Sequence, residues 1–408
     1  MYKSEFQIET AGSKLGLKNN WKQFSLLVLI NAFVGGMVGM ERNLLPQIAE
    51  NEFQLEAKSA ILSFIVIFGI TKAITNYYTG KLANTYGRKK LLVFGWVVAL
   101  PIPFLLMYGP SWEWILFANL LLGVNQGLCW SSTVVMKIDL VGQKDRGLAM
   151  GLNESAGYLA VGAVALLTSY IAAEFSLRPY PFMIGILLSS LGLILSGLFV
   201  EDTTHFVHQE TVTSTVKKLK QVFAESSWKD KNIGTISISG MINNLNDGMI
   251  WGLLPILLYD AGTTLTNIGI IVAIYPAVWG FGQAFTGKLA DLVSKKKLLF
   301  WGMLVQGISI FFYVIAESNF EFILASVLIG AGTAVVYPTF LAALADHSHP
   351  EQRAEVIGIY RLWRDLGYAI GAISSGIIAD LFGIKYAIIF IGLITIFSAF
   401  IIQVRMTK

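Results

Sequence analysis

Eight ionisable side chains lie inside stretches of this chain that are otherwise apolar, and half of them are acids. They are Glu41, Arg42, Lys72, Glu154, Asp247, Arg361, Arg364 and Asp365. Because a charge in hydrocarbon is costly, such residues line a water-filled passage or pair with one another. Basic groups in a passage can hold an anionic or strongly polar solute, and a carboxyl group can exchange a proton when its surroundings change. The pattern therefore indicates solute binding and proton exchange within a membrane.

The composition places the stretches around these charges in a bilayer. The 408 residues are 55% hydrophobic and 14% charged, whereas charged residues make up about 25% of a soluble domain. About 20 apolar residues suffice to cross a bilayer as a helix. We predict an all-α membrane protein with twelve transmembrane helices, at about 23–46, 59–79, 90–109, 112–136, 147–172, 181–200, 233–258, 266–287, 297–316, 321–344, 355–380 and 385–405.

The distribution of Lys and Arg predicts the orientation. With the N-terminus inside, 23 of the 30 basic residues fall on the cytoplasmic side, 3 outside and 4 within spans. The positive-inside rule then predicts that both termini are cytoplasmic. The first twenty residues have no apolar core, so they do not resemble a cleaved signal peptide. The net charge of +4 comes from short clusters rather than a stripe, so we expect no nucleic-acid partner.

The two halves of the chain repeat one pattern at an offset of 207 residues. Gly80-Lys81-Leu82-Ala83-Asn84 recurs as Gly287-Lys288-Leu289-Ala290-Asp291. The second repeated set is Asp139, Arg146 and Gly151, matched by Asp346, Arg353 and Gly358. Repeated halves around a midplane site are typical of secondary transporters. We predict a cytoplasmic segment 1–22, a six-helix bundle 23–200, a central cytoplasmic loop 201–232 and a second, pseudo-symmetric six-helix bundle 233–408.

The central loop carries its own periodic pattern. Val212, Val216, Leu219, Val222 and Phe223 recur at helical spacing, which predicts an amphipathic helix along the membrane face. A flexible tether with some local helicity is the alternative.

The chain resembles the major facilitator superfamily over essentially its whole length. The resemblance rests on the six-plus-six spans, the central loop and the repeated glycine-started motif, whose first copy continues to Gly87-Arg88-Lys89-Lys90. It implies a secondary transporter that works by rocker-switch alternating access. The segments 40–46 and 360–368 are similar to a bacterial branch that includes magnetosome-associated members.

Three departures from the family pattern leave the direction of transport open. Asn84 stands where the family's loop acid is expected, although Asp291 retains it in the second copy. Asn119 stands in place of the arginine usual in the fourth span. The fifth span, 147–172, lacks the proline of the drug antiporter signature.

Within this framework each buried polar residue has an expected role. The predicted substrate-binding residues are Arg42, Lys72, Asn76, Asp247, Arg361 and Arg364. The predicted proton-coupling residues are Glu41, Glu154 and Asp365. For the charges of the eleventh span the alternative is a set of permanent ion pairs that hold the halves together, and Glu41 and Arg42 could instead form an outer gate. Aromatic residues in the spans either pack or stack on a planar or sugar-like ligand.

The resemblance also implies a gate on the cytoplasmic side. Its predicted members are Asn84, Arg88, Asp139, Arg146, Asp291, Asp346 and Arg353. They would form salt bridges in one state and separate in the other, and ordinary interfacial charge is the alternative.

Several function classes have no support in the sequence. The four histidines, His205, His208, His347 and His349, lack further ligands at fitting spacing, so we expect no metal and no cofactor. The chain has one cysteine and no phosphate-binding glycine loop, so a gradient must supply the energy, and we expect no enzyme activity. We predict a monomeric inner-membrane transporter of a small polar or anionic organic solute, coupled to protons. The alternatives are a drug-type proton antiporter and a non-transporting receptor or scaffold of the same fold.

Overall fold

The computed structural model describes residues 15–55, 63–263 and 265–407, and in these ranges the regular structure is entirely helical. The first fourteen residues of the predicted segment 1–22 lie outside them. The N-terminal half contains α1 (Trp21–Arg42), α2 (Leu45–Asn51), α4 (Ser63–Tyr86), α5 (Arg88–Ala99), α6 (Ile102–Tyr108), α7 (Trp112–Val141), α8 (Arg146–Glu174), the short η2 (Tyr180–Phe182) and α9 (Met183–Leu198). The predicted all-α fold is confirmed.

The C-terminal half follows a connecting segment that is itself partly helical. This segment holds α10 (Thr204–Thr213), α11 (Val222–Ala224) and the π-helical turn η3 (Glu225–Lys229). The half then comprises α12 (Ile233–Asp260), α13 (Leu265–Leu292), α14 (Lys295–Ile315), α15 (Asn319–His347), the short η4 (Pro350–Gln352), α16 (Arg353–Phe382) and α17 (Ile384–Arg405).

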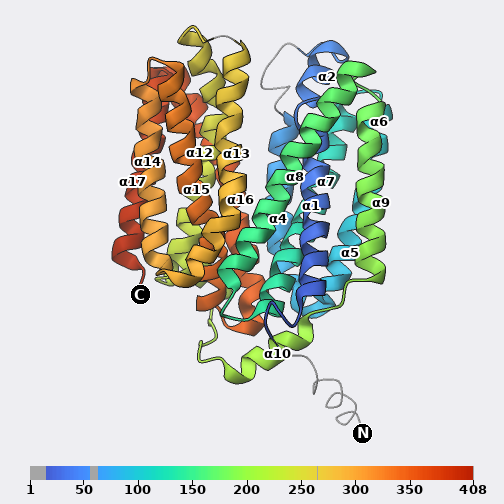
Figure 1. Cartoon of the computed structure of the whole chain (residues 1–408), viewed down its shortest axis with the longest axis vertical. Coiled ribbons are helices and arrows are strands. Elements are labelled where there is room, and N and C mark those ends of the chain that lie inside the picture. Colours follow the sequence, from blue (N-terminus) through green and yellow to red (C-terminus); the bar gives the residue numbers. More distant parts are fainter. Residues whose placement is uncertain (1–14, 56–62, 264, 408) are drawn as a thin grey trace.

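Nine helical stretches in the described residues are long and apolar enough to cross a membrane. Outside this group are α4, α7 and α12, which are 24, 30 and 28 residues long. Each of the three carries buried polar side chains, for example Asn76 in α4 and Asn244 in α12. They run alongside the other helices in the same two bundles (Figure 1), so the number of twelve spans stays a prediction.

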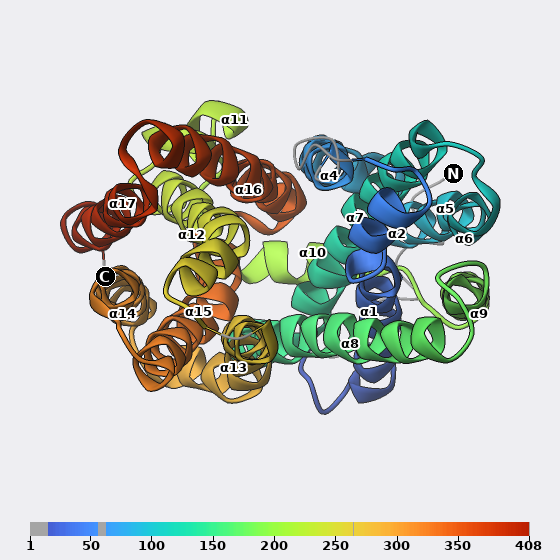
Figure 2. The same ribbon diagram turned by 90° about the horizontal axis from the view of Figure 1, so that it is seen from above.

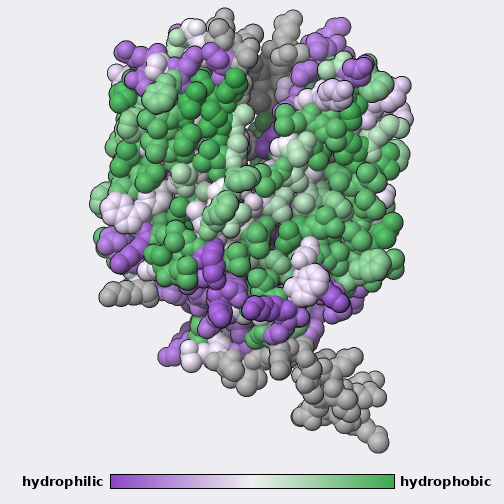
Figure 3. Space-filling view, viewed as in Figure 1, coloured by the Kyte–Doolittle hydropathy of each residue, from purple (hydrophilic) through white to green (hydrophobic). Residues whose placement is uncertain are grey.

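The two halves form separate bundles that stand side by side (Figures 1 and 2). They contact each other through α4 against α16 and through α8 against α13. These contacts are equivalent under the 207-residue repeat, since α4 corresponds to α13 and α8 to α16. A broad apolar band covers both bundles and is bounded by hydrophilic ends (Figure 3). Exposed side chains such as Leu166, Phe285 and Leu381 contribute to this band, as expected for a surface that faces lipid.

Four glycines bring the halves into backbone contact. A Cβ atom on Gly80 would lie 2.8 Å from the Cα of Gly358, and one on Gly287 would lie 2.7 Å from the Cα of Gly151. Any side chain at these positions would force the helices apart, as in other close helix contacts in membranes. The sequence pattern places Gly80 in a loop, but the helix continues to Tyr86 and the turn comes at Gly87, whose φ of +85° favours glycine.

Gly151 and Gly358 each lie five residues after an arginine, Arg146 or Arg353, that pairs with Glu210 of α10. We call this end of the molecule, where α10 crosses beneath both halves, the α10 end (Figure 1). At the opposite end, beside α2, Figure 3 shows a hollow between the halves with hydrophilic surface inside it. The halves are therefore closed against each other at the α10 end, whereas a hollow lies between them at the opposite end (Figure 3).

The helix of the connecting segment differs from the predicted one. It spans Thr204–Thr213, whereas the apolar periodicity placed it over 212–223, and residues 214–219 are not helical. Asp202 accepts a hydrogen bond from the backbone N–H of Thr204 (2.9 Å), which satisfies one donor at the start of α10. Further on, the Gln352 side chain binds both the N–H and the carbonyl of Leu219 (2.8 and 3.0 Å). The backbone of Leu219 thus finds its hydrogen-bond partner in the C-terminal half.

Candidate functional site

The middle of the contact between the halves holds a network of buried charged and polar side chains. Arg364 pairs with its neighbour Asp365 at 2.7 Å. The other oxygen of Asp365 accepts a 2.6 Å hydrogen bond from Asn76 of α4, across the interface. Asn76 in turn accepts a 2.6 Å hydrogen bond from Ser131 of α7. One carboxylate of the C-terminal half is thus held by an amide of the N-terminal half.

A second link between the halves runs through Arg361 and Glu154. The Nη2 of Arg361 lies 3.4 Å from Oε1 of Glu154, and both side chains are fully buried. The same oxygen accepts hydrogen bonds from Trp130 (3.0 Å) and Asn153 (2.7 Å). The other oxygen, Oε2, has no hydrogen-bond partner among the described residues. Glu154 therefore retains an open acceptor beside a long, weak ion pair.

Lys72 is a buried cation with no carboxylate within 4 Å in the described part of the chain. Its ammonium faces two rings, with Nζ 5.5 Å from the centre of Phe68 and 5.4 Å from that of Trp130. Lys72 and Asn76 are one helical turn apart, so their side chains lie on the same face of α4. We call Lys72, Asn76, Ser131, Glu154, Arg361, Arg364 and Asp365 the central charge cluster.

Rings from both halves meet beside this cluster. The ring of Tyr158 lies 5.3 Å from Trp130, 4.2 Å from Trp279 and 5.8 Å from Tyr337, and Tyr275 stacks on Trp279 at 5.9 Å. The hydroxyls of Tyr158 and Tyr337 are 3.1 Å apart. We call these five residues the aromatic cluster. It joins α7 and α8 to α13 and α15.

The remaining predicted residues lie in separate places. Arg42 stacks 3.8 Å from the ring centre of Trp251, in the other half. Glu41 is buried and accepts a 3.3 Å hydrogen bond from Asn119, the residue that replaces the family's arginine. Asp247 is buried within the C-terminal half, where it accepts a hydrogen bond from Tyr275. These three are not ion-paired with the central charge cluster within 4 Å in the described residues.

The predicted gate residues come together at the α10 end in a network that follows the repeat. Within the halves, Arg88 pairs with Asp139 (3.2 Å) and Lys295 with Asp346 (2.9 Å). Between the halves, Arg146 pairs with Asp346 at 2.8 Å, and Arg353 lies 3.9 Å from Asp139. Each contact in one half thus has its equivalent 207 residues away.

The two loop residues of the repeat differ in what they bind. The carboxylate of Asp291 accepts hydrogen bonds from the N–H groups of Gly147 (2.7 Å) and Leu148 (2.9 Å), at the start of α8. An acid at a helix N-terminus is favoured by the unpaired N–H groups and by the helix dipole. Its counterpart Asn84 donates instead to the carbonyl of Glu351. The departure from the family pattern therefore changes a cap on a helix into a single bond to a carbonyl.

Glu210, in α10, joins the two equivalent arginines. Its carboxylate accepts two 2.8 Å hydrogen bonds from Arg353 and is also paired with Arg146. Burial alone would raise the pKa of Glu210, but the two guanidinium groups outweigh it and hold that pKa below its ordinary value. The connecting segment is thus an integral part of the contact between the halves.

Sequence reasoning misses two of these residues. Glu210 lies in a polar segment, where nothing in the sequence distinguishes it from the neighbouring polar residues. Lys137 is fully buried and donates a 2.9 Å hydrogen bond to the carbonyl of Leu27, but it lies one residue beyond the predicted end of its span. A longer span, to Val141 as in α7, would have identified it.

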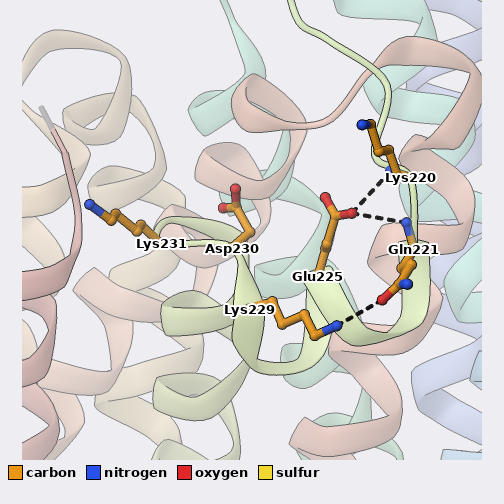
Figure 4. A pocket seen from close by; sticks show the side chains of 6 residues that line it. All are labelled: Lys220, Gln221, Glu225, Lys229, Asp230 and Lys231. Atoms are coloured by element: carbon orange, nitrogen blue, oxygen red, sulfur yellow. Dashed lines mark hydrogen bonds between the residues drawn. The ribbon is translucent and has the colours of Figure 1, made fainter.

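A separate hollow of about 450 Å³ lies on the connecting segment (Figure 4). It is lined by Lys220, Gln221, Glu225, Lys229, Asp230 and Lys231. Glu225 accepts hydrogen bonds from the N–H groups of Lys220 and Gln221, and Lys229 binds the Gln221 side chain. These polar groups bind one another on an open surface, away from the central charge cluster. No group of three potential metal ligands occurs among the described residues.

A duplicated helical membrane protein with buried charges between its halves and an ion-pair network at one end fits the class of secondary transporters. The sequence model of the Major Facilitator Superfamily matches residues 25–230 and 236–407. The chain belongs to this superfamily and is one of its membrane transporters. The narrower resemblance to a bacterial branch stays a prediction.

Individual relatives are distant but nearly full-length. The chain is 24% identical over 392 residues to the multidrug resistance protein MdtG of Proteus mirabilis, covering 93% of this chain and 95% of that protein. It is 23% identical over 377 residues to the proton-coupled antiporter flippase LtaA of Staphylococcus haemolyticus, covering 90% and 89%. Among solved structures, the human organic anion transporter MFSD10 superposes with a TM-score of 0.77 at 13% identity, covering 94% of this chain and 99% of that one. The proton:xylose symporter XylE superposes at 0.73 with 14% identity, covering 94% and 96%.

Proposed function

We propose that this transporter moves a small polar or anionic organic solute across the inner membrane, with both termini in the cytoplasm and a proton gradient as its energy source. One observation carries the proposal. Buried charges of the C-terminal half are held by polar groups of the N-terminal half through Asn76–Asp365 and Arg361–Glu154. A solute that binds these groups therefore acts on the contact between the halves.

The central charge cluster has donors and acceptors to offer a solute. Nη1 of Arg364, Nε of Arg361 and Oε2 of Glu154 are buried without hydrogen-bond partners among the described residues. Unpaired buried polar groups are costly, so a ligand that satisfies them is favoured. Together with Lys72 they would receive an anionic group and a second polar group of the solute.

Proton coupling follows from the same contacts. Asp365 is balanced by Arg364, and Glu154 by Arg361. If a solute anion takes over one of these guanidinium groups, the carboxylate loses its counter-charge, which favours its protonated form. Release of the solute would reverse the exchange. Glu41, which binds Asn119, is a further proton site on this scheme.

Alternating access would exchange the closed contact at the α10 end for closure at the opposite end. The pairs Arg146–Asp346 and Arg353–Asp139, together with Glu210, must separate for the α10 end to open. We propose that the predicted gate residues have this role. Closure at the opposite end would use contacts such as Arg42 against Trp251, which already join the halves.

Transport by purified protein in proteoliposomes tests the proposal. Vesicles with an imposed pH gradient are incubated with labelled organic acids, sugars, amino acids and cationic drugs. Accumulation of an acid or a polar solute that collapses with a protonophore is the expected result. Transport that does not depend on the pH gradient would contradict proton coupling. If the protein transports none of these solutes, it is a receptor or scaffold of the same fold.

A drug-type proton antiporter is the second candidate. Relatives named as multidrug resistance proteins favour it. Glu41 also favours it, because this buried acid of the first span accepts a hydrogen bond from the neutral amide of Asn119. The same vesicles distinguish it, because efflux of hydrophobic cations in exchange for protons would then exceed any transport of anions.

A further inference from the structure

We propose that the solute is an aromatic monoanion, such as an aryl carboxylate, held with its charge on Lys72 and Arg364 and its ring against Trp130 and Tyr158. This inference rests on the proposed function and specifies the solute of the same site. It starts from the position of the aromatic cluster, whose rings lie directly against the cations of the central charge cluster.

The cations of the site face rings as well as acids. Nζ of Lys72 lies 5.4 Å from the ring centre of Trp130, and the guanidinium carbon of Arg364 lies 5.4 Å from that of Tyr337. A carboxylate placed between Lys72 and the free Nη1 of Arg364 would therefore have an aromatic wall beside it. A ring attached to that carboxylate can stack on this aromatic wall, whereas an aliphatic chain is stabilised only by burial of its apolar surface.

The charge of the central charge cluster favours an anionic solute. When ionised, the central charge cluster contains three bases (Lys72, Arg361 and Arg364) and two acids (Glu154 and Asp365), all of them buried. One positive charge is in surplus. Because uncompensated charge is costly inside a protein, an anionic solute offsets this surplus and a neutral solute does not.

The aromatic cluster also connects a bound solute to both halves. Tyr158 of α8 is half-buried, and its ring contacts Trp130 in its own half and Trp279 in the other. A ring bound against Tyr158 would alter the 3.1 Å contact between its hydroxyl and that of Tyr337. Recognition of the ring and movement of the halves would thus depend on the same side chain.

Calorimetric titration of the detergent-solubilised full chain tests the inference with three matched ligands. Benzoate carries ring and charge, cyclohexanecarboxylate carries the charge without the π system, and benzamide carries the ring without the charge. We expect benzoate to bind about two- to tenfold tighter than cyclohexanecarboxylate. We expect benzamide to bind at least about tenfold more weakly than benzoate, because it lacks the charge-assisted hydrogen bonds.

Variants assign the two parts of the solute. Lys72→Gln should weaken benzoate and leave benzamide unchanged. Tyr158→Leu should abolish the preference for benzoate over cyclohexanecarboxylate, and Tyr158→Phe, which keeps the ring and loses the hydroxyl, should retain it.

Each other outcome contradicts a defined statement. Equal binding of the two carboxylates overturns the aromatic part while leaving an anion transporter. Benzamide binding as tightly as benzoate overturns the charge. If no anion binds and the vesicles transport only a neutral polar solute, this inference fails and the proposed function stands. If the vesicles transport no solute at all, the proposed function itself fails.

Discussion

Arg146 and Arg353 stand 207 positions apart and bind the same carboxylate, that of Glu210 in the connecting segment. The two arginines are equivalent members of the repeated halves, so a single acid outside both repeats joins them. Glu210 therefore holds the two halves together at the α10 end through both arginines.

Glu210→Gln should destabilise the closed protein. Loss of the charge leaves two buried guanidinium groups with weaker acceptors, at a cost of about 1.5–3 kcal/mol. The pKa of Glu210 lies below its ordinary value of 4.5. The contribution of the Glu210 carboxylate to the free energy of unfolding is therefore complete above about pH 4.5. It is lost as the pH falls through the lowered pKa. Thermal unfolding followed by near-UV circular dichroism should show a melting-temperature difference from the parent protein at pH 7 that shrinks in acid.

The matched control for that substitution is Glu174→Gln, an exposed acid at the end of α8. It should melt like the parent protein at both pH values. Equal losses for Glu174→Gln and Glu210→Gln would show that Glu210 has no special role.

Gly80→Ala should open the α10 end. The added Cβ would lie 2.8 Å from the Cα of Gly358, and overpacking of this kind costs about 1–3 kcal/mol. The ratio of open to closed molecules should then rise by about 5- to 150-fold. Spin labels at Lys90→Cys and Lys297→Cys, exposed and equivalent in the repeat, measure the change when the native Cys129 is replaced by serine.

Gly69→Ala is the control in the same helix, because a Cβ there meets no atom within 4 Å. Its distance distribution should match that of the parent protein. An unchanged distribution for Gly80→Ala would contradict the assignment of this contact to the closed state.

Arg364→Ala and Asp365→Asn should abolish transport and leave expression and thermal stability nearly intact. The aspartate-to-asparagine change keeps the shape beside Asn76 but removes the charge that balances Arg364. Asp380→Asn changes an exposed acid of the same helix and should transport normally. If both cluster variants only unfold the protein, the pairs are structural and do not bind solute.

Glu154→Gln separates proton movement from solute movement. Exchange of labelled for unlabelled solute needs no net proton transfer, so it should persist, whereas accumulation driven by a pH gradient should be lost. Glu41→Gln is measured in parallel, and the variant that keeps exchange but loses accumulation identifies the proton site. If both variants keep accumulation, proton coupling through these two carboxyl groups is contradicted.

Asp291→Ala should loosen the α10 end more than Asn84→Ala. Asp291 accepts two backbone N–H groups at the start of α8, a cap that is worth about 1 kcal/mol, whereas Asn84 donates to one carbonyl at an exposed position. The Lys90–Lys297 label pair reports both variants. Equal effects would mean that the difference between the two copies has no consequence for closure.

The buried charges of the spans could be recognised from the sequence because each one contrasts with apolar neighbours. Their pairing could not, because it depends on contacts between residues as distant as Asn76 and Asp365. The ion-paired residues at the α10 end recur in both halves, so the repeat singles them out. Their role as a gate is implied by the family resemblance and stays a prediction. Glu210 belongs to neither copy, so the repeat says nothing about it.

The connecting segment shows the limit of periodicity. Its apolar spacing predicts a helix over 212–223, but the backbone of Leu219 bonds to Gln352, 133 residues away. A local pattern contains no information about such a partner. The helix forms instead at Thr204–Thr213, where Asp202 supplies a local acceptor.

The glycine contacts have a consequence for how the chain could arise. Each joins one residue of the Gly80 type to one of the Gly151 type from the other half, so two identical six-helix subunits would make both contacts at once. A homodimer is thus a sufficient ancestor for this interface, and fusion of the two genes would free the copies to diverge. Positions 84 and 291, one an amide and the other an acid, differ in the way that such divergence allows.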